Sequence, residues 1–364
     1  MGKVVSALLE KYRDKELTTK IVSAVRELMP SRHVKFVHVC GSHEQTITRF
    51  GLRSLLPDNL EVFSGPGCPV CCTPAAEIDE AIELARQGIL ITTFGDMLRV
   101  PGTKKSLSMA KTDGADVRIV YGVADAVEIA RRNPKQEVVH VAIGFETTAP
   151  STAAEVLRKP PENFSLLICH RLIPPAMEFL LASGETTIDG FICPGHVSTV
   201  IGSKPYEPLS EHYKVPQVIA GFEPVDVLLG IWMLLKQLRE GRHEVEIEYT
   251  RSVRPEGNVI AQEKMQKVFE VVDKRWRGFP VVPSSAFELR REFRNYDARK
   301  KFGVQVKDFV EFAKGCRCGE VLRGVIYPSE CPLFGKACTQ EHPVGPCAVT
   351  SEGACNVAMK HEKF

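Results

Sequence analysis

The sequence predicts an α/β protein with two similar Rossmann-like domains, each built on a parallel sheet, and a C-terminal cysteine-rich domain. Short β-branched runs alternate with amphipathic helical patterns over the first two-thirds of the 364 residues, which is typical of βαβ units. The last fifty residues lose this periodicity and contain six of the twelve cysteines. Because this length exceeds what one hydrophobic core usually serves, we expect three domains, at residues 1–122, 123–238 and 239–364.

The expected strands are short apolar segments, and amphipathic helices are expected between them. The strands are Val34–Val39, Ile89–Thr93, Val117–Tyr121, Val138–Ile143, Leu166–Cys169, Phe191–Cys193 and Val218–Ala220. The helical patterns cover Ala75–Gln87, Ala124–Arg132 and Pro175–Ala182. After residue 240 the pattern changes, and we expect helices at Ala261–Lys274 and Val306–Lys314.

A faint internal repeat supports the prediction of two similar domains. The segment Gly88–Gly102 aligns with Asp189–Gly202 at an offset of about 100 residues, each with a strand followed by glycine. Loops at the carboxyl ends of the strands are expected to face a shared cleft, because open α/β sheets usually bind ligands there.

Composition and charge narrow the classes of function. The 47 basic and 45 acidic side chains nearly cancel, so we expect neither nucleic-acid nor membrane binding. The most apolar run, Val225–Leu235, is too short to cross a bilayer and predicts a buried helix. Twelve cysteines behind a charged N-terminus without a signal-peptide pattern indicate the reducing cytoplasm, where clustered cysteines more often bind metal or carry out redox chemistry.

The cysteines of the tail predict a metal centre. Six thiols exceed the four that a cubane iron–sulfur cluster or a structural zinc site requires. Their spacing matches neither the compact ferredoxin motif nor paired zinc knuckles, so it indicates a metal more firmly than it indicates which metal. We favour iron–sulfur, with zinc and no metal as the alternatives. The six are Cys316, Cys318, Cys331, Cys338, Cys347 and Cys355.

Cys40 follows a predicted strand, with His43 and Glu44 in the next turn. A thiol at a strand end and helix N-terminus has its thiolate favoured by backbone N–H groups. The imidazole of His43 is then a candidate base or second ligand. The alternative is a buried strand cysteine followed by a solvent-facing His–Glu pair.

The segment SGPGCPVCC contains a C-x-x-C unit, Cys68 to Cys71. This spacing suits a reversible disulfide or two metal ligands. Pro69 stiffens the loop, and Gly65 and Gly67 allow close backbone approach. A zinc knuckle normally has a second C-x-x-C, which this chain lacks, so we favour redox chemistry.

Glu146 and His196 each follow a predicted strand and are candidates for the cleft. The alternative for each is a helix cap or an ordinary surface residue. Cys169 and Cys193 lie in apolar strands and are expected to be inert core residues. No nucleotide-binding glycine motif is present.

These motifs together resemble the HypD family of hydrogenase maturation factors. The matching segments occur in order over nearly the whole chain: CGSHE (Cys40–Glu44), GPGCPVC (Gly65–Cys71), TFGDMLRVPG (Thr93–Gly102), GFETT (Gly144–Thr148), PGHVSTVIG (Pro194–Gly202), AGFEP (Ala220–Pro224), and RCGEVL, CPLFG and SEGAC in the tail.

The resemblance implies a cytoplasmic protein of two similar α/β domains and a third domain that carries a [4Fe–4S] cluster. It implies a scaffold that works with a HypC-type chaperone to hold the iron of the Fe(CN)2CO group of [NiFe]-hydrogenase, while a HypE-type protein delivers cyanide. Cys40 would then hold the iron, and Cys68 and Cys71 would be the redox pair. By motif match, the cluster ligands are Cys318, Cys331, Cys338 and Cys355.

Some residues and functions stay open at this point. We expect His43, with Glu146 or His196, to position or protonate groups at the iron. Cys72, Cys316 and Cys347 have no role by motif, although C-x-x-C geometry favours Cys71 over Cys72 as the partner of Cys68. The isolated chain is expected to be a monomer. The competing functions are a stand-alone iron–sulfur dithiol reductase and a zinc-stapled binding module.

Overall fold

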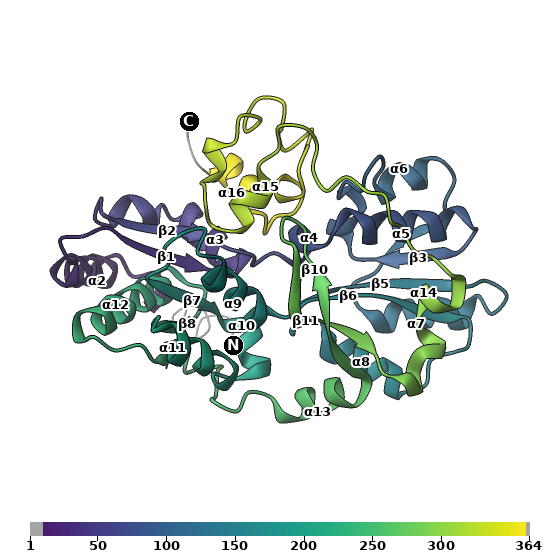
Figure 1. Ribbon diagram of the computed structural model, residues 1–364, viewed down its shortest axis with the longest axis horizontal. Helices are drawn as coiled ribbons and strands as arrows, with labels where there is room; N and C mark the ends of the chain where they lie inside the picture. The colour runs from purple at the N-terminus through teal and green to yellow at the C-terminus, as the bar shows by residue number, and fades with distance from the viewer. Residues whose placement is uncertain (1–9, 362–364) are drawn as a thin grey trace.

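Two parallel sheets form the framework of the computed structural model, which describes residues 10–361 (Figure 1). The first sheet has the order β2-β1-β7-β8-β9, with strands β1 (Val34–His38), β2 (Leu60–Ser64), β7 (Gly190–Pro194), β8 (Gln217–Ala220) and β9 (Val245–Ile247). The second has the order β4-β3-β5-β6, with strands β3 (Leu90–Thr93), β4 (Val117–Ile119), β5 (Val138–Gly144) and β6 (Phe164–His170). The predicted α/β class with two parallel sheets is confirmed.

The two sheets share one winding order. Counting strands within each sheet by position in the chain, both begin 2-1-3-4, which is a doubly wound arrangement. The order reverses between β1 and β7 in the first sheet and between β3 and β5 in the second. Ligands of such sheets sit beyond the carboxyl ends of the strands at these points. Cys40 therefore lies at the switch point of the first sheet.

The first sheet is formed by two separate parts of the chain. Strands β1 and β2 precede the four strands of the second sheet in the sequence, and β7, β8 and β9 follow them. The expected boundary at residues 122 and 123 falls between β4 and β5, which belong to the same sheet. The sequence repeat also pairs β3 with β7, whereas the strand order makes β5 the counterpart of β7. The repeat thus predicted the similarity of the sheets, but it could not show how the chain passes between them.

All seven expected strands are present, and their ends differ from the expected ones by at most two residues. The expected helix Ala261–Lys274 is only half right, because α13 (Val259–Val268) ends and the chain continues as strand β10 (Phe269–Arg275). β10 pairs with β11 (Val281–Leu289) as an antiparallel hairpin. The expected helix Val306–Lys314 is wrong. Its backbone is held by other segments instead, since Val310 N–H donates to Thr103 Oγ1 and Glu311 C=O accepts from Arg277.

Helices flank both sheets. Those that follow or precede strands of the first sheet are α2 (Lys15–Leu28), α3 (Gly41–Arg49), α10 (Gly195–Ile201), α11 (Glu207–Tyr213) and α12 (Pro224–Glu240). Those around the second sheet are α5 (Ala75–Arg86), α6 (Leu107–Thr112), α7 (Val123–Arg132) and α8 (Ala149–Leu157). The helix α9 (Ile173–Ser183) connects β6 to β7 and lies beside α10 in Figure 1. The short helix α4 (Pro69–Cys72) lies between the two sets and contacts β5.

The buried helix expected at Val225–Leu235 is the centre of α12. Pro224 begins this helix and Gly241, at φ +67°, ends it. Its apolar face packs on β8, β7 and α2, burying residues such as Leu228 and Leu234. No helix in residues 10–361 is long and apolar enough to cross a membrane.

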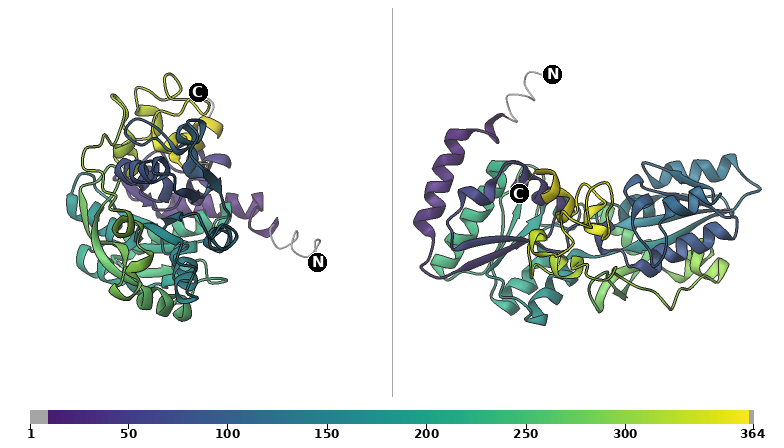
Figure 2. Two further views of the ribbon diagram at one scale, coloured as in Figure 1. Left: turned by 90° about the vertical axis from the view of Figure 1, so that its right-hand side faces the viewer. Right: turned by 90° about the horizontal axis from the view of Figure 1, so that it is seen from above.

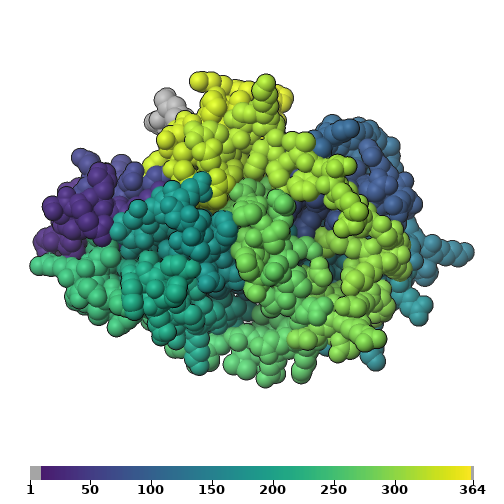
Figure 3. Space-filling view, in the orientation of Figure 1, coloured from purple at the N-terminus to yellow at the C-terminus, as the bar shows by residue number. Residues whose placement is uncertain are grey.

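The C-terminal part of the chain lies across the junction of the two sheets. The hairpin β10–β11 packs against α9 and β6, and the helix α14 (Ala298–Phe302) follows it. The cysteine-rich tail, with α15 (Cys318–Leu322) and α16 (Ala354–His361), sits above the junction in Figures 1 and 3 and between the two sheets in the view from above in Figure 2. The tail contacts both sides, since α16 packs on α3 and the turn Pro346–Ala348 packs on α4.

Buried ion pairs fix the segment before the tail to the second sheet. Arg299 of α14 contacts Glu80 (Nε–Oε2 2.8 Å) and Glu77 (Nη2–Oε1 3.2 Å) of α5, and it donates to the carbonyl of Ile168. Arg171, at the end of β6, contacts the other oxygen of Glu77 at 2.9 Å. Both carboxylates are almost fully buried, so each depends on these arginines for its charge compensation.

Replacing Arg299 by methionine should therefore lower the free energy of unfolding by about 3–5 kcal/mol, because it leaves buried carboxylates short of a partner. Lys300→Met is the matched control, since the neighbouring Lys300 pairs with Asp297 only at the surface, and it should change stability by less than about 0.5 kcal/mol. Urea unfolding of both variants tests this, and equal effects would contradict it.

Candidate functional site

Cys40 caps the helix that follows the first strand. It is the N-cap residue of α3 and makes no side-chain cap hydrogen bond, but the backbone N–H groups of Ser42 and His43 lie near its thiol and favour the thiolate. Burial nevertheless raises the pKa of Cys40 to about 11, and those N–H groups offset only part of this shift. The expected placement at a strand end and helix N-terminus is confirmed. In the free protein near pH 7 the group is a thiol, and a bound metal would displace its proton.

The loop before α4 lies directly on the backbone of Cys40. The N–H of Gly41 donates to the carbonyl of Gly67 at 3.1 Å. A Cβ atom at Gly67 would collide with the backbone N of Cys40. Glycine is required here because the two strand-end loops approach closer than a side chain permits. This contact joins the segments that follow β1 and β2.

Cys68 and Cys71 form a disulfide bond, with their Cα atoms 5.3 Å apart. Cys68 is the N-cap residue of α4, and its Sγ accepts from the N–H of Cys71 at 3.2 Å. Both residues are buried. Cys71 is therefore the partner of Cys68, as C-x-x-C geometry favoured. Cys72 is buried as a free thiol, burial raises its pKa, and its nearest charge is that of Arg171.

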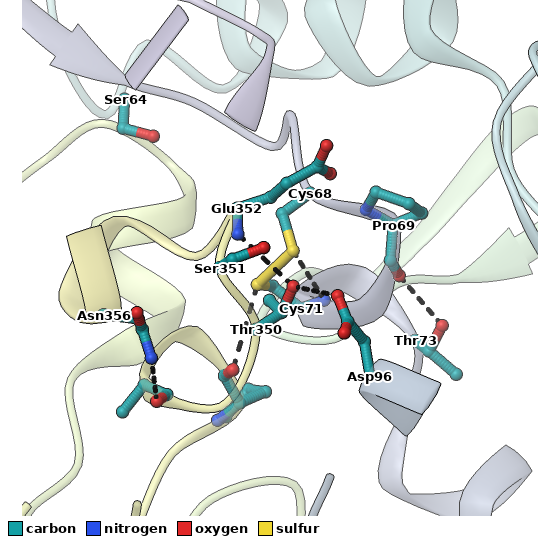
Figure 4. The surroundings of a disulfide bond; sticks show 12 residues. Ser64, Cys68, Pro69, Cys71, Thr73, Asp96, Thr350, Ser351, Glu352 and Asn356 are labelled. Atoms are coloured by element: carbon teal, nitrogen blue, oxygen red, sulfur yellow. Dashed lines mark hydrogen bonds between the residues drawn. A yellow bond between two sulfur atoms is a disulfide. The ribbon is translucent and has the colours of Figure 1, made fainter. Parts of the chain in front are cut away.

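Two carboxyl groups flank the disulfide, and the sequence analysis missed both. Figure 4 draws Glu352 beside Cys68 and Asp96 near Cys71. Glu352 also lies against α3, since a Cβ at Gly41 would be 2.5 Å from the Cβ of Glu352. Asp96 accepts from the hydroxyl of Thr350 at 2.7 Å. Burial raises the pKa of Glu352, with a further contribution from Asp96. Both residues lay in quoted motifs, but nothing in the residue types alone distinguished them.

His43 is held in place by backbone and aromatic contacts. Its Nε2 lies 2.9 Å from the carbonyl oxygen of Gly221 and 3.2 Å from that of Ala220, so this nitrogen carries the proton. Burial lowers the pKa of His43 to about 3, and the imidazole is neutral. Phe222 stacks between His43 and His196, at ring centroid distances of 5.2 and 3.8 Å. The segment Ala220–Pro224 thus acts by orienting His43.

Glu44, next to His43, is part of a buried ion network. Its carboxylate contacts His38 Nε2 at 2.7 Å and the guanidinium of Arg53 at 2.7 and 3.0 Å. Burial opposes its ionisation, but Arg53 and His38 together hold the pKa of Glu44 below its usual range. The alternative of a solvent-facing His–Glu pair is therefore wrong, because both side chains are buried.

Glu146 lies in a groove separate from the residues around Cys40. It lines a cavity of about 430 Å³ together with apolar side chains of α9, α10, α13 and the β10–β11 hairpin. One carboxylate oxygen accepts from the N–H of Ile173 at 3.0 Å, and the other has no partner. Burial raises the pKa of Glu146 to about 7. The lining of this groove includes neither Cys40 nor His43.

Four thiols of the tail meet at one point. The thiols of Cys316, Cys347 and Cys355 lie within hydrogen-bonding reach of Cys318. The hydrogen bond from Cys318 lowers the pKa of Cys316 to about 7. Cys338 is next to this group: it acts electrostatically on Cys355, and its Sγ accepts from Val344 N–H at 3.3 Å. Of the ligands expected by motif, Cys318 and Cys355 are therefore in the group, together with the unassigned Cys316 and Cys347.

Cys331 and Cys338 form a turn beside the group rather than part of it. Phe334 N–H donates to the carbonyl of Cys331, and Cys338 N–H donates to that of Leu333. Among residues 10–361, no set of three or more histidine, cysteine or acidic side chains has the geometry to hold a metal ion.

The chemistry of the donor set nevertheless fits a metal–sulfur centre. Its thiols are nearly all buried, and Gly345 makes room for them, because a Cβ there would lie 2.6 and 2.7 Å from the sulfurs of Cys318 and Cys316. Soft thiolate ligands in such surroundings suit iron–sulfur clusters or zinc.

The thiol group of the tail lies beside the disulfide. The sulfur of Cys71 is 3.9 Å from the carbonyl oxygen of Pro346, whose neighbour is Cys347. In space, the disulfide therefore lies between two other groups of sulfur atoms. The tail thiols are on one side of it, and the Cys40 thiol is on the other, beyond the Gly67 contact.

Glu146 should make stability depend on pH. Its folded pKa of about 7 exceeds the unfolded value near 4.5, so protonation favours the folded state, and that contribution is lost as pH rises from about 4.5 to 7. Glu146→Gln should gain up to about 3 kcal/mol relative to the parent over this range. Unfolding curves at pH 4.5, 6 and 8 test this, with the exposed Glu162→Gln as control. A difference that does not change with pH would contradict it.

The thiols should differ in reactivity. Of the ten free cysteines in the described chain, Cys316 alone is not fully buried, and its lowered pKa of about 7 provides thiolate at neutral pH. In metal-free protein with the disulfide intact, we expect iodoacetamide to modify Cys316 at least tenfold faster than Cys40 at pH 7.5. Peptide mass spectrometry measures both rates. Cys318→Ala should slow Cys316 by removing the hydrogen bond, and Cys40 reacting first would contradict the assignment.

Comparison with known proteins shows which family the chain belongs to. Residues 15–362 match the HypD family model, described as the hydrogenase formation hypA family. The chain is 45% identical to a hydrogenase maturation factor HypD of Cupriavidus necator over 369 residues, which cover 98% of this chain and 97% of that protein. It is 45% identical to HypD2 of Bradyrhizobium diazoefficiens over 368 residues, with the same coverage. A protein of Methanocaldococcus jannaschii is 49% identical over 356 residues, 96% of this chain and 99% of that protein. The chain belongs to the HypD family.

Proposed function

We propose that this protein acts in hydrogenase maturation, as a scaffold on which iron receives its cyanide and carbonyl ligands. Relatives over nearly the whole chain are named hydrogenase maturation factors. The observation that carries the proposal is the contact between the Cys40 segment and the disulfide loop at Gly67, with the tail thiols on the other side of the disulfide. An anchoring thiol and a redox pair are thereby neighbours.

Cys40 is the proposed anchor for the substrate iron, together with a thiol of a HypC-type chaperone. Iron with cyanide and carbonyl ligands is a soft ion that suits thiolate coordination. The pKa of Cys40, about 11, means that iron must displace a proton from sulfur. Glu352 lies beside Cys40 and is a suitable acceptor for that proton. His43, protonated at Nε2 and neutral, is fixed as a positioning group.

The disulfide is the proposed two-electron store. When a HypE-type donor presents cyanide as a thiocyanate group, R–S–C≡N, release of cyanide breaks the S–C bond and needs two electrons. The dithiol form of Cys68 and Cys71 supplies them: R–SCN and two thiols give R–SH, cyanide, a proton and the disulfide. Asp96 and Glu352 flank the pair and are placed to take up that proton. Two electrons and two protons then regenerate the dithiol.

The tail thiols are the proposed ligands of a [4Fe–4S] cluster, which would supply single electrons to the disulfide beside it. Cys318 and Cys355 are common to the motif-based set and to the group of contacting thiols. Cys71 is the nearer sulfur of the pair, because it contacts Pro346 in the turn that carries Cys347.

The competing stand-alone disulfide reductase is less well supported, because the Cys68 and Cys71 side chains are only 4% and 0% exposed. A protein disulfide would need an accessible thiolate for exchange. A buried pair instead suits a small group delivered to one place.

Co-purification with a HypC-type chaperone provides the test. Infrared spectra of the complex should show cyanide and carbonyl bands, and Cys40→Ala should lose them together with the bound substrate iron. Cys68→Ala and Cys71→Ala should reduce the cyanide bands at least tenfold while the brown colour of the cluster remains. Cys193→Ala is the matched control, because Cys193 is a buried thiol of β7 that contacts Gln217 and belongs neither to the disulfide nor to the tail thiols, and it should keep the bands.

Other outcomes would contradict the proposal in distinct ways. Cyanide bands that persist in Cys40→Ala would remove the anchoring role. Dithiol turnover on small disulfides without any bands would favour the reductase. Colourless protein that contains zinc after anaerobic purification would favour the binding module.

A further inference from the structure

Arg277 is a buried arginine that lies between the disulfide helix and the tail thiols. It follows β10, and only 1% of its surface is exposed. Its backbone N–H donates to the carbonyl of Cys72 at 2.8 Å, which fixes it to the end of α4. The next residue, Gly278, packs on the residue after Cys318, since a Cβ there would be 2.7 Å from the Cα of Gly319. The backbone geometry thus positions Arg277 at the thiol group.

The guanidinium of Arg277 is incompletely compensated. Its Nε and Nη2 both donate to one neutral acceptor, the carbonyl of Glu311, at 3.0 and 2.6 Å. The nearest carboxylate oxygen, also of Glu311, is 3.6 Å away. Nη1 has no hydrogen-bond partner. The ring of Phe312 also faces the guanidinium, with its centroid 5.6 Å from Cζ. A buried cation costs several kcal/mol unless negative charge faces it, so one carbonyl, one aromatic ring and one distant carboxylate leave this cation under-compensated.

The other ionisable groups near Arg277 are thiols of the tail. Besides Glu311, these are Cys318, Cys347 and Cys316. Burial also raises the pKa of Glu311, which weakens that residue as a counter-ion. A thiol carries negative charge once it binds metal, because the thiolate is the ligand. Metal binding by the tail would therefore supply the charge that Arg277 lacks.

We propose that Arg277 is the fixed positive charge that balances the metal-bound tail thiolates and raises the reduction potential of the centre that they hold. The inference rests on the proposed function, in which those thiols hold a [4Fe–4S] cluster. Four thiolates around such a cluster give a net charge of −2, and reduction by one electron makes it −3. A nearby cation stabilises the reduced state more than the oxidised one, and net charge is one of the properties that set such potentials.

Arginine suits this role better than lysine. Its guanidinium stays charged in buried surroundings, and its planar group can donate to Glu311 while one N–H group remains directed elsewhere. Because the backbone of Arg277 is fixed to Cys72, the charge lies near the path between the cluster and the disulfide.

Redox titration of the cluster-loaded protein tests the inference. Iron and sulfide content, unfolding temperature and midpoint potential are measured under anaerobic conditions for the parent, Arg277→Gln and Arg277→Lys. We expect Arg277→Gln to keep its cluster but to shift the reduction equilibrium at least tenfold toward the oxidised form. For one electron, this shift lowers the midpoint potential by about 59 mV. Arg277→Lys, which keeps the charge, should recover most of that shift. Arg275→Gln is the matched control, since Arg275 is an exposed arginine of the same hairpin, and it should shift the equilibrium less than threefold.

The outcomes separate this inference from the proposed function. A parent protein without a cluster overturns both. A loaded Arg277→Gln variant with the midpoint potential of the parent overturns the inference alone. If the glutamine and lysine variants lose the cluster or the fold to the same extent, Arg277 acts through packing and not through charge, and the inference is again overturned.

Discussion

The close contact between Gly67 and the backbone of Cys40 is the constraint on which the site depends. It brings the ends of β1 and β2 within hydrogen-bonding distance, so that the Cys40 thiol and the disulfide come from adjacent loops of one sheet. Any side chain at Gly67 would push them apart. The helices α3 and α4 begin at Cys40 and Cys68, and both sulfurs therefore lie at positions fixed by backbone hydrogen bonds.

The tail completes the site by contacting both sheets at once. Glu352 packs on α3, Thr350 bonds Asp96 after β3, and Pro346 meets Cys71. The tail holds this position through buried apolar side chains such as Leu322 and Val357 and through polar contacts that are distributed over both partners. The same segment that gathers the thiols also brings a carboxyl group to the disulfide, so assembly of the tail and assembly of the site are one process.

The sequence predicted the elements better than their connections. Alternating apolar runs located all seven expected strands, since burial on both faces leaves a clear pattern. Four strands escaped: the short strand β2, the half-buried strand β9 and both strands of the β10–β11 hairpin, of which β10 was expected to be part of a helix. Cys40 and the disulfide were recognisable from spacing, whereas Glu352, Asp96 and Arg277 were not. Their importance arises from contacts between segments more than 200 residues apart. Local periodicity of the sequence cannot predict such contacts.

The interleaved path of the chain has a consequence for synthesis. The second sheet is contiguous in sequence, and its last strand, β6, ends at His170. The first sheet lacks β7, β8 and β9 until residue 247 has been made. On a ribosome, β1 must therefore wait for its second neighbour, β7, while the second sheet folds, whereas β2 is an edge strand throughout. Cys40 and the cysteines of α4 leave the ribosome early, and the tail that packs on α3 and α4 is made last. The sulfurs at the junction of the two sheets are therefore enclosed only at the end of translation.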